Sequence, residues 1–284
     1  MKQTYLSIGA LAVATFALIV VLSSGNVTSH QSLADKVIES GTIRVGYIVY
    51  PPDVIKDPST GQLSGVSYDL VNQAAKNLGL KTVWVEEVGW DTALEGLHTG
   101  RYDMVGTFMW ANSKRARAAG LSTPVVYSAV YPYARTGDYR FTRDLGVLDS
   151  SNFTIATVDG EMTSMIAKDQ FPTAKTYSLP DNASLSEALL GVQSGKADIT
   201  FVEPAIAKDY LKNNPGSLSP VSTVPTRVLA NVFAVDRGQE TFLSMWNRAL
   251  TELINDGTVE RMLEKYGTKD SFVPVASPIG SNWK

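Results

Sequence analysis

The chain carries, at residues 92–108, the stretch "TALEGLHTGRYDMVGTF", and a second stretch, "EALLGVQSGKADITFVE" at 187–203, follows the same plan. Each has leucines at helical spacing, then a glycine, a basic residue, an aspartate and a run of strand-forming residues. Corners in which a helix, a glycine and a strand follow one another are common in α/β proteins, and this alone could explain the similarity of the two stretches. The alternative is two lobes of similar build, each with its own sheet, since a spacing of roughly 95 residues suits a lobe of domain size.

Strands and helices alternate along the first third of the chain. Strand patterns cover 42–50, 81–88 and 102–108, and helical patterns cover 68–80 and 90–100. Alternation of this kind is typical of a parallel sheet covered by helices. The sequence therefore predicts an α/β fold.

The C-terminal third has a strand pattern at 230–236 and a helical pattern at 239–267, which is broken by the Asp256-Gly257 turn. Charged and apolar residues alternate there with the helical period. The final residues, 271–284, show no periodic pattern, and we expect them to lack regular structure.

Bulk composition is that of an ordinary globular protein. The 284 residues are 44% hydrophobic and 19% charged, with a net charge of −3. This length predicts one large domain or two smaller ones. The absence of cysteine excludes disulfides, thiolate catalysis, cysteine–zinc sites and a lipid-modified N-terminal cysteine.

The N-terminus has the pattern of an export segment. Lys2 precedes an uncharged run of 18 residues, 5–22, and a polar stretch follows it. We expect residues 1–29 to be a cleaved signal peptide or a retained N-terminal membrane anchor. Both interpretations place the rest of the chain outside the cytoplasm.

Several catalytic patterns are missing from the sequence. It has no G-x-S-x-G elbow, no phosphate-binding G-x-x-x-x-G-K loop and no dinucleotide-binding G-x-G-x-x-G. The two histidines, His30 and His98, have no metal-ligand spacing with any other residue. The common hydrolase, kinase and dehydrogenase interpretations therefore have no support, and no cofactor is implied.

A cluster of cations, Lys114, Arg115 and Arg117, lies just beyond the strand 102–108. Open α/β sheets bind ligands at this end of their strands. A nucleic-acid surface would need further basic residues and aromatics nearby, but the next basic residue is Arg135. We expect Lys114 and Arg117 to be solvated and Arg115 to be a cation available to one small anion.

The second stretch supplies an anionic counterpart. Its strand ends in Glu203, and Pro204 permits a helix to start there. A zwitterionic small molecule between Arg115 and Glu203 would satisfy both charges. The alternative for Glu203 is a carboxylate that stabilises the N-terminus of the helix.

With these features, residues 40–268 resemble the type 2 periplasmic solute-binding proteins of polar amino-acid ABC importers, bacterial solute-binding family 3. The resemblance rests on six stretches in the family's order: "GTIRVGYIVYPP", "GQLSGVSYDLVNQAAKNLGL", "GWDTALEGLHTGRYDM", "SKRARAAGLSTPVVYS", "SGKADITFVEP" and "LTELINDGTVERMLEKYG".

The resemblance implies two α/β lobes joined by two crossing strands, "VYPYAR" and "NVFAV". Lobe 1 would comprise residues 40–134 and 231–268, and lobe 2 residues 135–230. Residues 269–284 would form a C-terminal tail.

The resemblance also implies roles for individual residues. Arg115 would hold a ligand α-carboxylate, because a planar guanidinium forms two parallel hydrogen bonds to a carboxylate. Glu203 would take the α-ammonium group. Thr107 lies near the positions that assist the carboxylate, and Gly160 belongs to a loop whose N–H groups cap it.

Tyr50 and Trp90 match aromatic positions that enclose the ligand side chain; core packing is the alternative for both. The chain also departs from the family's pattern. Phe108 and Trp110 stand where small hydroxyl residues are usual, and Asp53 stands where an aromatic is usual.

Further departures lie in the loop of Gly160, where Glu161 and Met162 replace the usual Ser/Thr pair, and at Glu203, which is longer than the usual Asp. These departures leave room for a small ligand other than a standard amino acid. Asp53 and Glu161, placed in the cleft, would favour extra positive charge on that ligand.

The sequence thus predicts a periplasmic, monomeric receptor that closes on a small polar, amino-acid-like ligand and delivers it to an inner-membrane ABC permease. An enzyme on the same scaffold, similar to periplasmic cyclohexadienyl dehydratases, is a second hypothesis, with Glu161 or Glu203 as the general acid. An orphan sensor subunit is a third.

Overall fold

The fold is known from a computed structural model that describes residues 31–275, and within it the chain from Leu33 forms one compact unit. The first group of elements is α2 (Leu33–Ser40), β1 (Thr42–Tyr47), β2 (Ile55–Lys56), β3 (Leu63–Ser64), α3 (Val66–Asn77), β4 (Lys81–Glu87), α4 (Ala93–His98), β5 (Met104–Trp110), α5 (Ser113–Ala118) and β6 (Ala119–Leu121). The second group is β7 (Val126–Arg135), the 3-10 helix η1 (Leu145–Leu148), β8 (Thr154–Val158), α6 (Met162–Gln170), β9 (Lys175–Leu179), α7 (Leu185–Gln193), β10 (Ile199–Val202), α8 (Pro204–Asn213) and β11 (Leu218–Pro220). The chain then continues with β12 (Arg227–Asp236), α9 (Glu240–Asn255), α10 (Thr258–Lys265) and β13 (Phe272–Pro274).

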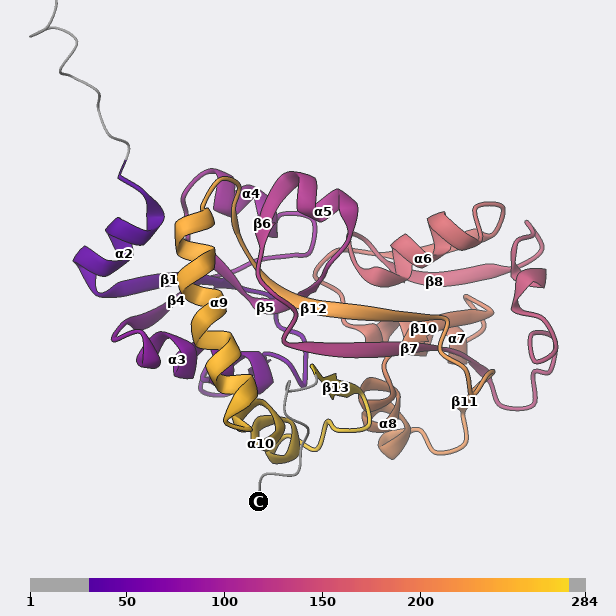
Figure 1. The fold of residues 1–284 in the computed structure, drawn as a ribbon. Coiled ribbons are helices and arrows are strands. Elements are labelled where there is room, and N and C mark those ends of the chain that lie inside the picture. The colour runs from indigo at the N-terminus through magenta and orange to yellow at the C-terminus, as the bar shows by residue number, and fades with distance from the viewer. Residues whose placement is uncertain (1–30, 276–284) are drawn as a thin grey trace, which may run out of the picture. The chain divides into compact units, whose positions relative to one another are not determined.

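The strands are ordered β4-β1-β5-β12-β7-β10-β8-β9 (Figure 1). The outer pairs β1/β4, β1/β5, β8/β9 and β8/β10 are parallel, as expected when helices connect successive strands. The central pairs β5/β12, β7/β12 and β7/β10 are antiparallel. The α/β prediction is confirmed, with antiparallel strands at the centre of the order.

Two long strands connect the two parallel groups. Residues 126–130 of β7 pair with residues 227–231 of β12, and residues 131–134 of β7 pair with β10. The other end of β12 pairs with β5. β7 and β12 therefore connect the first parallel group of strands to the second.

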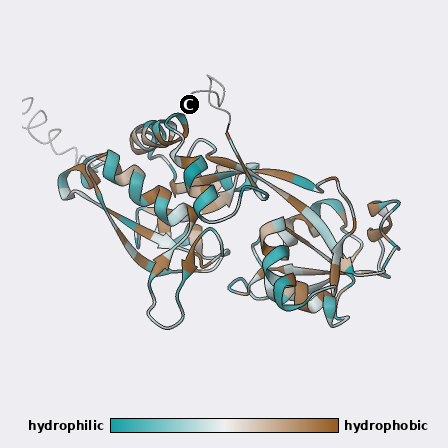
Figure 2. Cartoon of the chain, turned by 90° about the horizontal axis from the view of Figure 1, so that it is seen from below, coloured by the Kyte–Doolittle hydropathy of each residue, from teal (hydrophilic) through white to brown (hydrophobic). Residues whose placement is uncertain are grey.

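The described residues form two apolar clusters, one of which extends from the second parallel group into the first, where it includes Val105 and Met109 of β5. Around β1 and β5, residues from α2, α3, α9 and α10 form one cluster, in which Trp246 of α9 stacks on Phe242 and meets Phe233 edge-on. Around β8 and β10, residues from α6 and α7 contribute to the other, in which Phe171 and Phe201 stack at 5.7 Å. The helices alternate between hydrophilic and hydrophobic stretches in Figure 2, as amphipathic helices over a sheet do.

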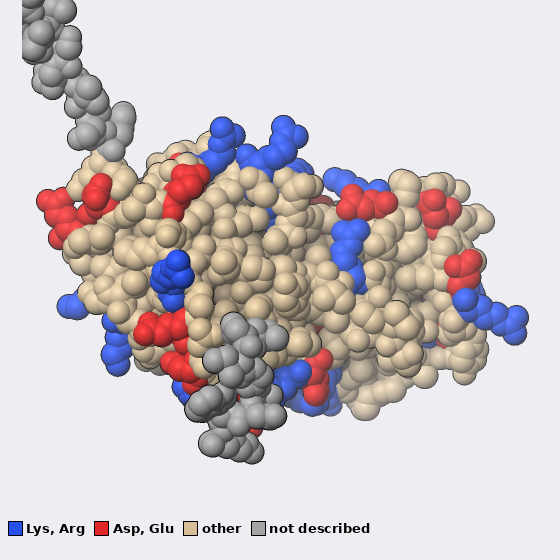
Figure 3. Space-filling model, viewed as in Figure 1, with Lys and Arg blue, Asp and Glu red and all other residues tan. Residues whose placement is uncertain are grey.

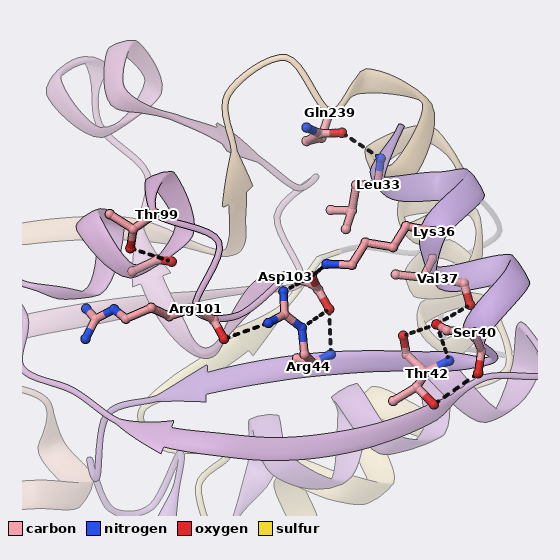
Figure 4. Close-up of polar contacts among 11 residues, drawn as sticks. Leu33, Lys36, Val37, Ser40, Thr42, Arg44, Thr99, Arg101, Asp103 and Gln239 are labelled. Atoms are coloured by element: carbon pink, nitrogen blue, oxygen red, sulfur yellow. Dashed lines mark hydrogen bonds and ion pairs between the residues drawn. The ribbon is translucent and has the colours of Figure 1, made fainter. Parts of the chain in front are cut away.

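The corner between α4 and β5 is held by Asp103. Its N–H donates to the carbonyl of Arg44 at 2.8 Å, and its Oδ2 accepts from the N–H of Arg44 at 2.9 Å. Figure 4 shows the side chains of Arg44 and Lys36 converging on the same carboxylate, with Arg44 Nη2 at 2.7 Å and Lys36 Nζ at 2.9 Å from Oδ1. Gly100 makes the preceding turn with φ +70°.

The corner between α7 and β10 repeats this arrangement. Asp198 N donates to Thr154 O at 2.8 Å, and Asp198 Oδ2 accepts from Thr154 N at 2.9 Å. Gly195 makes the turn with φ +78°. The two sequence stretches are therefore structurally equivalent, including the hydrogen bonds of their aspartates to the next strand.

One expectation about the C-terminus is wrong. The sequence predicts no regular structure for 271–284, but β13 forms within this range. It forms by antiparallel pairing with β7, in which Val273 lies opposite Tyr127. Residues 276–284 lie outside the described part, as does the predicted export segment 1–29. The remaining helix and strand patterns fall on elements of the same type, with ends shifted by a few residues.

Charges on the face seen in Figure 3 are interspersed, with basic and acidic side chains separated by uncharged surface. This face has no basic field of the kind that binds nucleic acid. No helix between residues 31 and 275 has the length and apolar character required to span a membrane.

Candidate ligand-binding site

A cavity of about 530 Å³ lies where the residues after β4 and β5 meet the loop between β8 and α6. Its wall includes Trp90, Trp110, Arg115, Asp159, Gly160 and Ser178. This volume is in the range of small-molecule sites. Residues that follow strands of both parallel groups therefore surround one polar and aromatic space.

Arg115 is placed by the start of α5. Asn112 caps this helix and accepts a hydrogen bond from the N–H of Arg115 at 2.8 Å. The helix turns Arg115 inward and leaves Lys114 and Arg117 exposed. The guanidinium then donates from Nη1 to the carbonyl of Trp110 at 3.0 Å and from Nη2 to the carbonyl of Gly160 at 3.3 Å.

Two tryptophans lie within cation–π distance of this guanidinium. Its central carbon is 5.7 Å from the ring centre of Trp90 and 5.8 Å from that of Trp110. The two indoles stack at 5.2 Å, and Tyr50 meets both edge-on. Burial lowers the pKa of Arg115 to about 10, and the charge of Glu161 opposes this shift.

Gly160 allows the loop before α6 to approach the segment that follows β4. It adopts φ +70°, and a Cβ atom there would lie 2.2 Å from Oδ1 of Asp91. A residue with a side chain would therefore separate the two segments. The same close approach of the two segments allows the carbonyl of Gly160 to accept a hydrogen bond from the guanidinium of Arg115.

Glu161 caps α6 with its own side chain. Its Oε2 accepts from the N–H of Thr163 at 2.6 Å and from the hydroxyl of Thr163 at 2.7 Å, and the N–H of Met162 also points to this carboxyl. Its Oε1 is buried and has no hydrogen-bond partner in the described part of the chain. Burial raises the pKa of Glu161 to about 8.

Glu203 follows β10 and stands at the N-cap of α8, but its side chain makes no capping bond. Instead, its Oε2 accepts from the hydroxyl of Tyr50 at 3.0 Å, and the hydroxyl of Ser128 also hydrogen-bonds to it. Burial raises its pKa to about 7. The Glu203 side chain therefore bonds to Tyr50 and Ser128 and does not cap α8.

The structure brings only part of the predicted set to the cavity. Arg115, Trp90 and Gly160 line it, whereas Tyr50 and Glu203 are buried beside each other and do not line it. Thr107 is fully buried and uses its hydroxyl within the sheet. It accepts from the N–H of Ile48 at 2.8 Å and donates to the Ile48 carbonyl at 2.9 Å.

The sequence did not identify Trp110 as a site residue, although its bulk at a position for small hydroxyl residues was a signal. Asp53, another departure, is buried and accepts from the N–H of Phe108 at 2.7 Å. Burial raises its pKa to about 7. Among residues 31–275, no group of three or more histidine or acidic side chains is arranged to hold a metal ion.

This fold and site are those of a binding protein, and comparison with protein families agrees. The model of the bacterial extracellular solute-binding proteins, family 3, matches residues 43–269. The chain belongs to this family.

Curated relatives include a probable amino-acid ABC transporter-binding protein of Haemophilus influenzae, 26% identical over 93% of this chain and 95% of that protein. The L-cystine-binding protein TcyJ of Escherichia coli is 26% identical over 91% of this chain and 93% of its own length. A cyclohexadienyl dehydratase of Pseudomonas aeruginosa is 23% identical over 72% of this chain and 74% of its own length. The similar curated proteins thus include amino-acid-binding proteins and an enzyme.

Solved structures share the fold. The ancestral amino acid-binding protein AncCDT-1, a precursor of cyclohexadienyl dehydratase, superposes with a TM-score of 0.72 at 27% identity, covering 83% of this chain and 99% of that one. An ancestral arginine-binding protein bound to arginine gives a TM-score of 0.68 at 28% identity, covering 80% and 98%.

Proposed function

We propose that this protein is an exported receptor that captures a small polar, amino-acid-like ligand between two lobes and delivers it to an ABC permease. One observation carries the proposal: residues from the two halves of the sheet, Trp90 and Arg115 on one side and Asp159 and Ser178 on the other, line one cavity. Hydrogen bonds beside it also join the halves, from Arg115 to the carbonyl of Gly160 and from Tyr50 to Glu203.

The two lobes correspond to residues 40–134 with 231–268, and to residues 135–230. The pairing of β7 and β12 with both groups of strands supports their role as the crossing strands. Only the closed form touches a ligand with both lobes, so binding shifts the population toward closure. Residues 269–284 follow lobe 1 in this scheme, and β13 within them pairs with β7.

The ligand-binding residues of the proposal are Arg115, Glu203, Tyr50, Trp90, Thr107 and Gly160. Thr107 acts indirectly, because its hydroxyl fixes the segment of Ile48, two residues before Tyr50. Relatives named for L-cystine and histidine, and an ancestral protein bound to arginine, support the ligand class.

The proposal places the protein in the periplasm, with residues 1–29 as a signal peptide or anchor. It acts as a monomer without a cofactor, and its partners are the ligand and the permease, not nucleic acid. Intact-mass measurement of periplasmic protein should show a chain that begins between residues 23 and 32. Full-length protein confined to membranes would indicate the anchor, which favours the sensor role, and full-length cytosolic protein would contradict export.

A thermal-shift screen tests capture directly. The exported chain is heated with individual amino acids, their amides, the corresponding amines and small organic acids. A ligand that binds the folded state raises the melting temperature in proportion to the logarithm of its concentration above Kd. Stabilisation by at least one of these compounds is expected, and a flat response to all of them would contradict the receptor function.

A dehydratase is the second candidate, favoured by the two buried carboxyl groups of Glu161 and Glu203. Their pKa values of about 8 and 7 keep a large fraction protonated near neutral pH, as a general acid requires. Incubation with prephenate separates the two functions, since a receptor produces no turnover. Loss of prephenate that disappears in Glu161→Gln or Glu203→Gln would establish the enzyme.

A further inference from the structure

The contact between the two halves of the sheet buries more acidic than basic groups. The first half is built on β4, β1 and β5, and the second half on β10, β8 and β9. Asp53, Glu161 and Glu203 are 1%, 0% and 2% exposed. Arg115 is the one buried lysine or arginine among the described residues. A buried carboxylate without a paired cation is costly, and a proton relieves this cost. The joined arrangement of the halves therefore favours protonated carboxyl groups.

Glu203 of the second half meets the first half directly. Its Oε2 accepts from the hydroxyl of Tyr50 at 3.0 Å, and the hydroxyl of Ser128 in β7 also hydrogen-bonds to it. The charged groups that face it, Asp53 and Glu161, are both acidic. Burial raises the pKa of the Tyr50 hydroxyl well above its ordinary value, so Tyr50 stays a neutral donor. Separation of the halves would remove Tyr50 and expose Glu203 to water, which favours the ionised carboxylate.

Glu161 lies at the same contact, one residue after Gly160. The carbonyl of Gly160 accepts from Arg115 of the first half at 3.3 Å, and the charge of Glu161 acts on both Arg115 and Tyr50. Glu161 Oε1 has no hydrogen-bond partner within the described residues. A buried carboxyl oxygen without a donor costs less free energy in the protonated group than in the ionised group. Separation of the halves would admit water to this oxygen and remove the cost.

Asp53 differs from these two residues, because its hydrogen bonds stay within the first half. Its Oδ2 accepts from the N–H of Phe108 at 2.7 Å, and Ser67 also hydrogen-bonds to its carboxyl. These bonds do not depend on the second half. We therefore assign Asp53 to the pH dependence of folding, and Glu161 and Glu203 to that of closure.

We propose that closure of the two halves takes up protons at Glu161 and Glu203, so that the receptor closes more readily and binds more tightly in acidic than in alkaline surroundings. The inference rests on the proposed receptor function, in which closure accompanies capture. Burial raises the pKa of Glu161 to about 8 and of Glu203 to about 7, whereas an exposed glutamate has a value near 4. The closed form therefore holds more protons than the open form above about pH 4, and closure weakens as pH rises through 7 and 8. Neither carboxyl lines the cavity, so this effect does not require a ligand of particular charge.

Spin labels on two introduced cysteines measure closure directly, since the chain has no cysteine of its own. Glu95 of α4 and Asn182, which follows β9, are exposed, belong to different halves and line one groove. In a chain with Glu95→Cys and Asn182→Cys, double electron–electron resonance should show a short label-to-label distance whose share falls from pH 6 to pH 9. A share that stays constant or grows over this range would overturn the inference.

Substitutions in the doubly labelled chain test the two carboxyl groups. Glu203→Gln keeps an acceptor for the Tyr50 hydroxyl but cannot ionise, and Glu161→Gln likewise keeps the size of its side chain. Each should reduce the pH dependence of the short distance, and one suffices if the other folds poorly. Glu240→Gln, an exposed substitution at the start of α9, should keep the full dependence. Full dependence in both Glu161→Gln and Glu203→Gln would overturn the assignment.

Affinity should follow closure. The amino acid or organic acid that stabilises the wild type most in the thermal-shift screen should bind at least about tenfold more weakly at pH 8 than at pH 6. Each proton taken up changes affinity by up to about tenfold per pH unit. Equal affinity at the two pH values would overturn the inference and leave the receptor function intact. A flat screen would contradict the receptor function, whereas the spin-label distances would still decide whether closure takes up protons.

Discussion

The hydroxyl of Tyr50 donates to Oε2 of Glu203 at 3.0 Å, although the two residues are 153 positions apart. Tyr50 follows β1, and Glu203 follows β10, so the bond joins the two parallel groups of strands. Both side chains are buried. The bond is direct evidence that the described structure has its two halves closed on each other at this point.

Removal of this donor should weaken closure. Tyr50→Phe keeps the ring but leaves a buried oxygen of Glu203 without its partner, which typically costs about 1–3 kcal/mol. We expect a lower free energy of unfolding in urea at pH 7 and weaker binding of any ligand found in the screen. Tyr139→Phe, at a position that is 78% exposed, is the matched control and should match the wild type. Identical behaviour of Tyr50→Phe and wild type would show that the bond contributes nothing.

Stability should fall as pH rises from about 5 to about 8. Burial raises the pKa of Asp53 to about 7, of Glu161 to about 8 and of Glu203 to about 7, whereas their ordinary values are near 4. Between these limits the folded protein holds more protons than the unfolded chain, so the free energy of unfolding decreases with pH. Above about pH 8 the three carboxyl groups are deprotonated in the folded and the unfolded chain alike, so they cause no further decrease in the free energy of unfolding.

The melting temperature at pH 5, 6, 7 and 8 measures this dependence. Glu161→Gln removes one of the three groups and should flatten the curve, whereas the exposed control Glu240→Gln should leave it unchanged. A melting temperature that stays constant or increases over this range would contradict the assigned protonation.

Trp90→Ala should reduce both ligand affinity and stability. The indole lines the cavity, but it is only 4% exposed and contacts Trp110, Tyr50 and Arg115. Truncation of a buried tryptophan typically costs about 3–5 kcal/mol. Trp90→Phe retains an aromatic face and should recover part of both losses. A lower melting temperature with unchanged affinity would mean that Trp90 serves packing alone.

Much of the fold could be predicted from the sequence because local patterns decide it. The corners at Gly100 and Gly195 each combine a positive φ with an aspartate that hydrogen-bonds to a neighbouring strand. The similarity of the stretches 92–108 and 187–203 shows these features in the sequence. The strand β13 could not be predicted, since three residues near a terminus form a strand only through pairing with β7.

Part of the candidate site could also be predicted, because it depends on which residues follow each strand. Arg115 comes after β5 and Glu203 comes after β10, so the sequence pattern could place each of them beyond one of two equivalent strands. Glu161 caps α6 through a contact over two residues, but glutamate is not one of the usual capping residues, and the partner of the Thr107 hydroxyl, Ile48, lies 59 residues away. Sequence spacing does not reveal such contacts.

The most direct test of the receptor function is calorimetric titration of Arg115→Ala and Arg117→Ala with the amino acid or organic acid that stabilises the wild type most in the thermal-shift screen. Arg115 is buried and bridges the carbonyls of Trp110 and Gly160, whereas Arg117 is exposed and does not line the cavity. Loss of a buried, hydrogen-bonded charge typically costs about 2–5 kcal/mol. At about 1.4 kcal/mol per factor of ten, this predicts a roughly 30-fold to several thousandfold weaker affinity for Arg115→Ala. Arg117→Ala should change affinity by less than about fivefold, as for an exposed charge. Wild-type affinity in Arg115→Ala would contradict the assignment of this cleft as the ligand site.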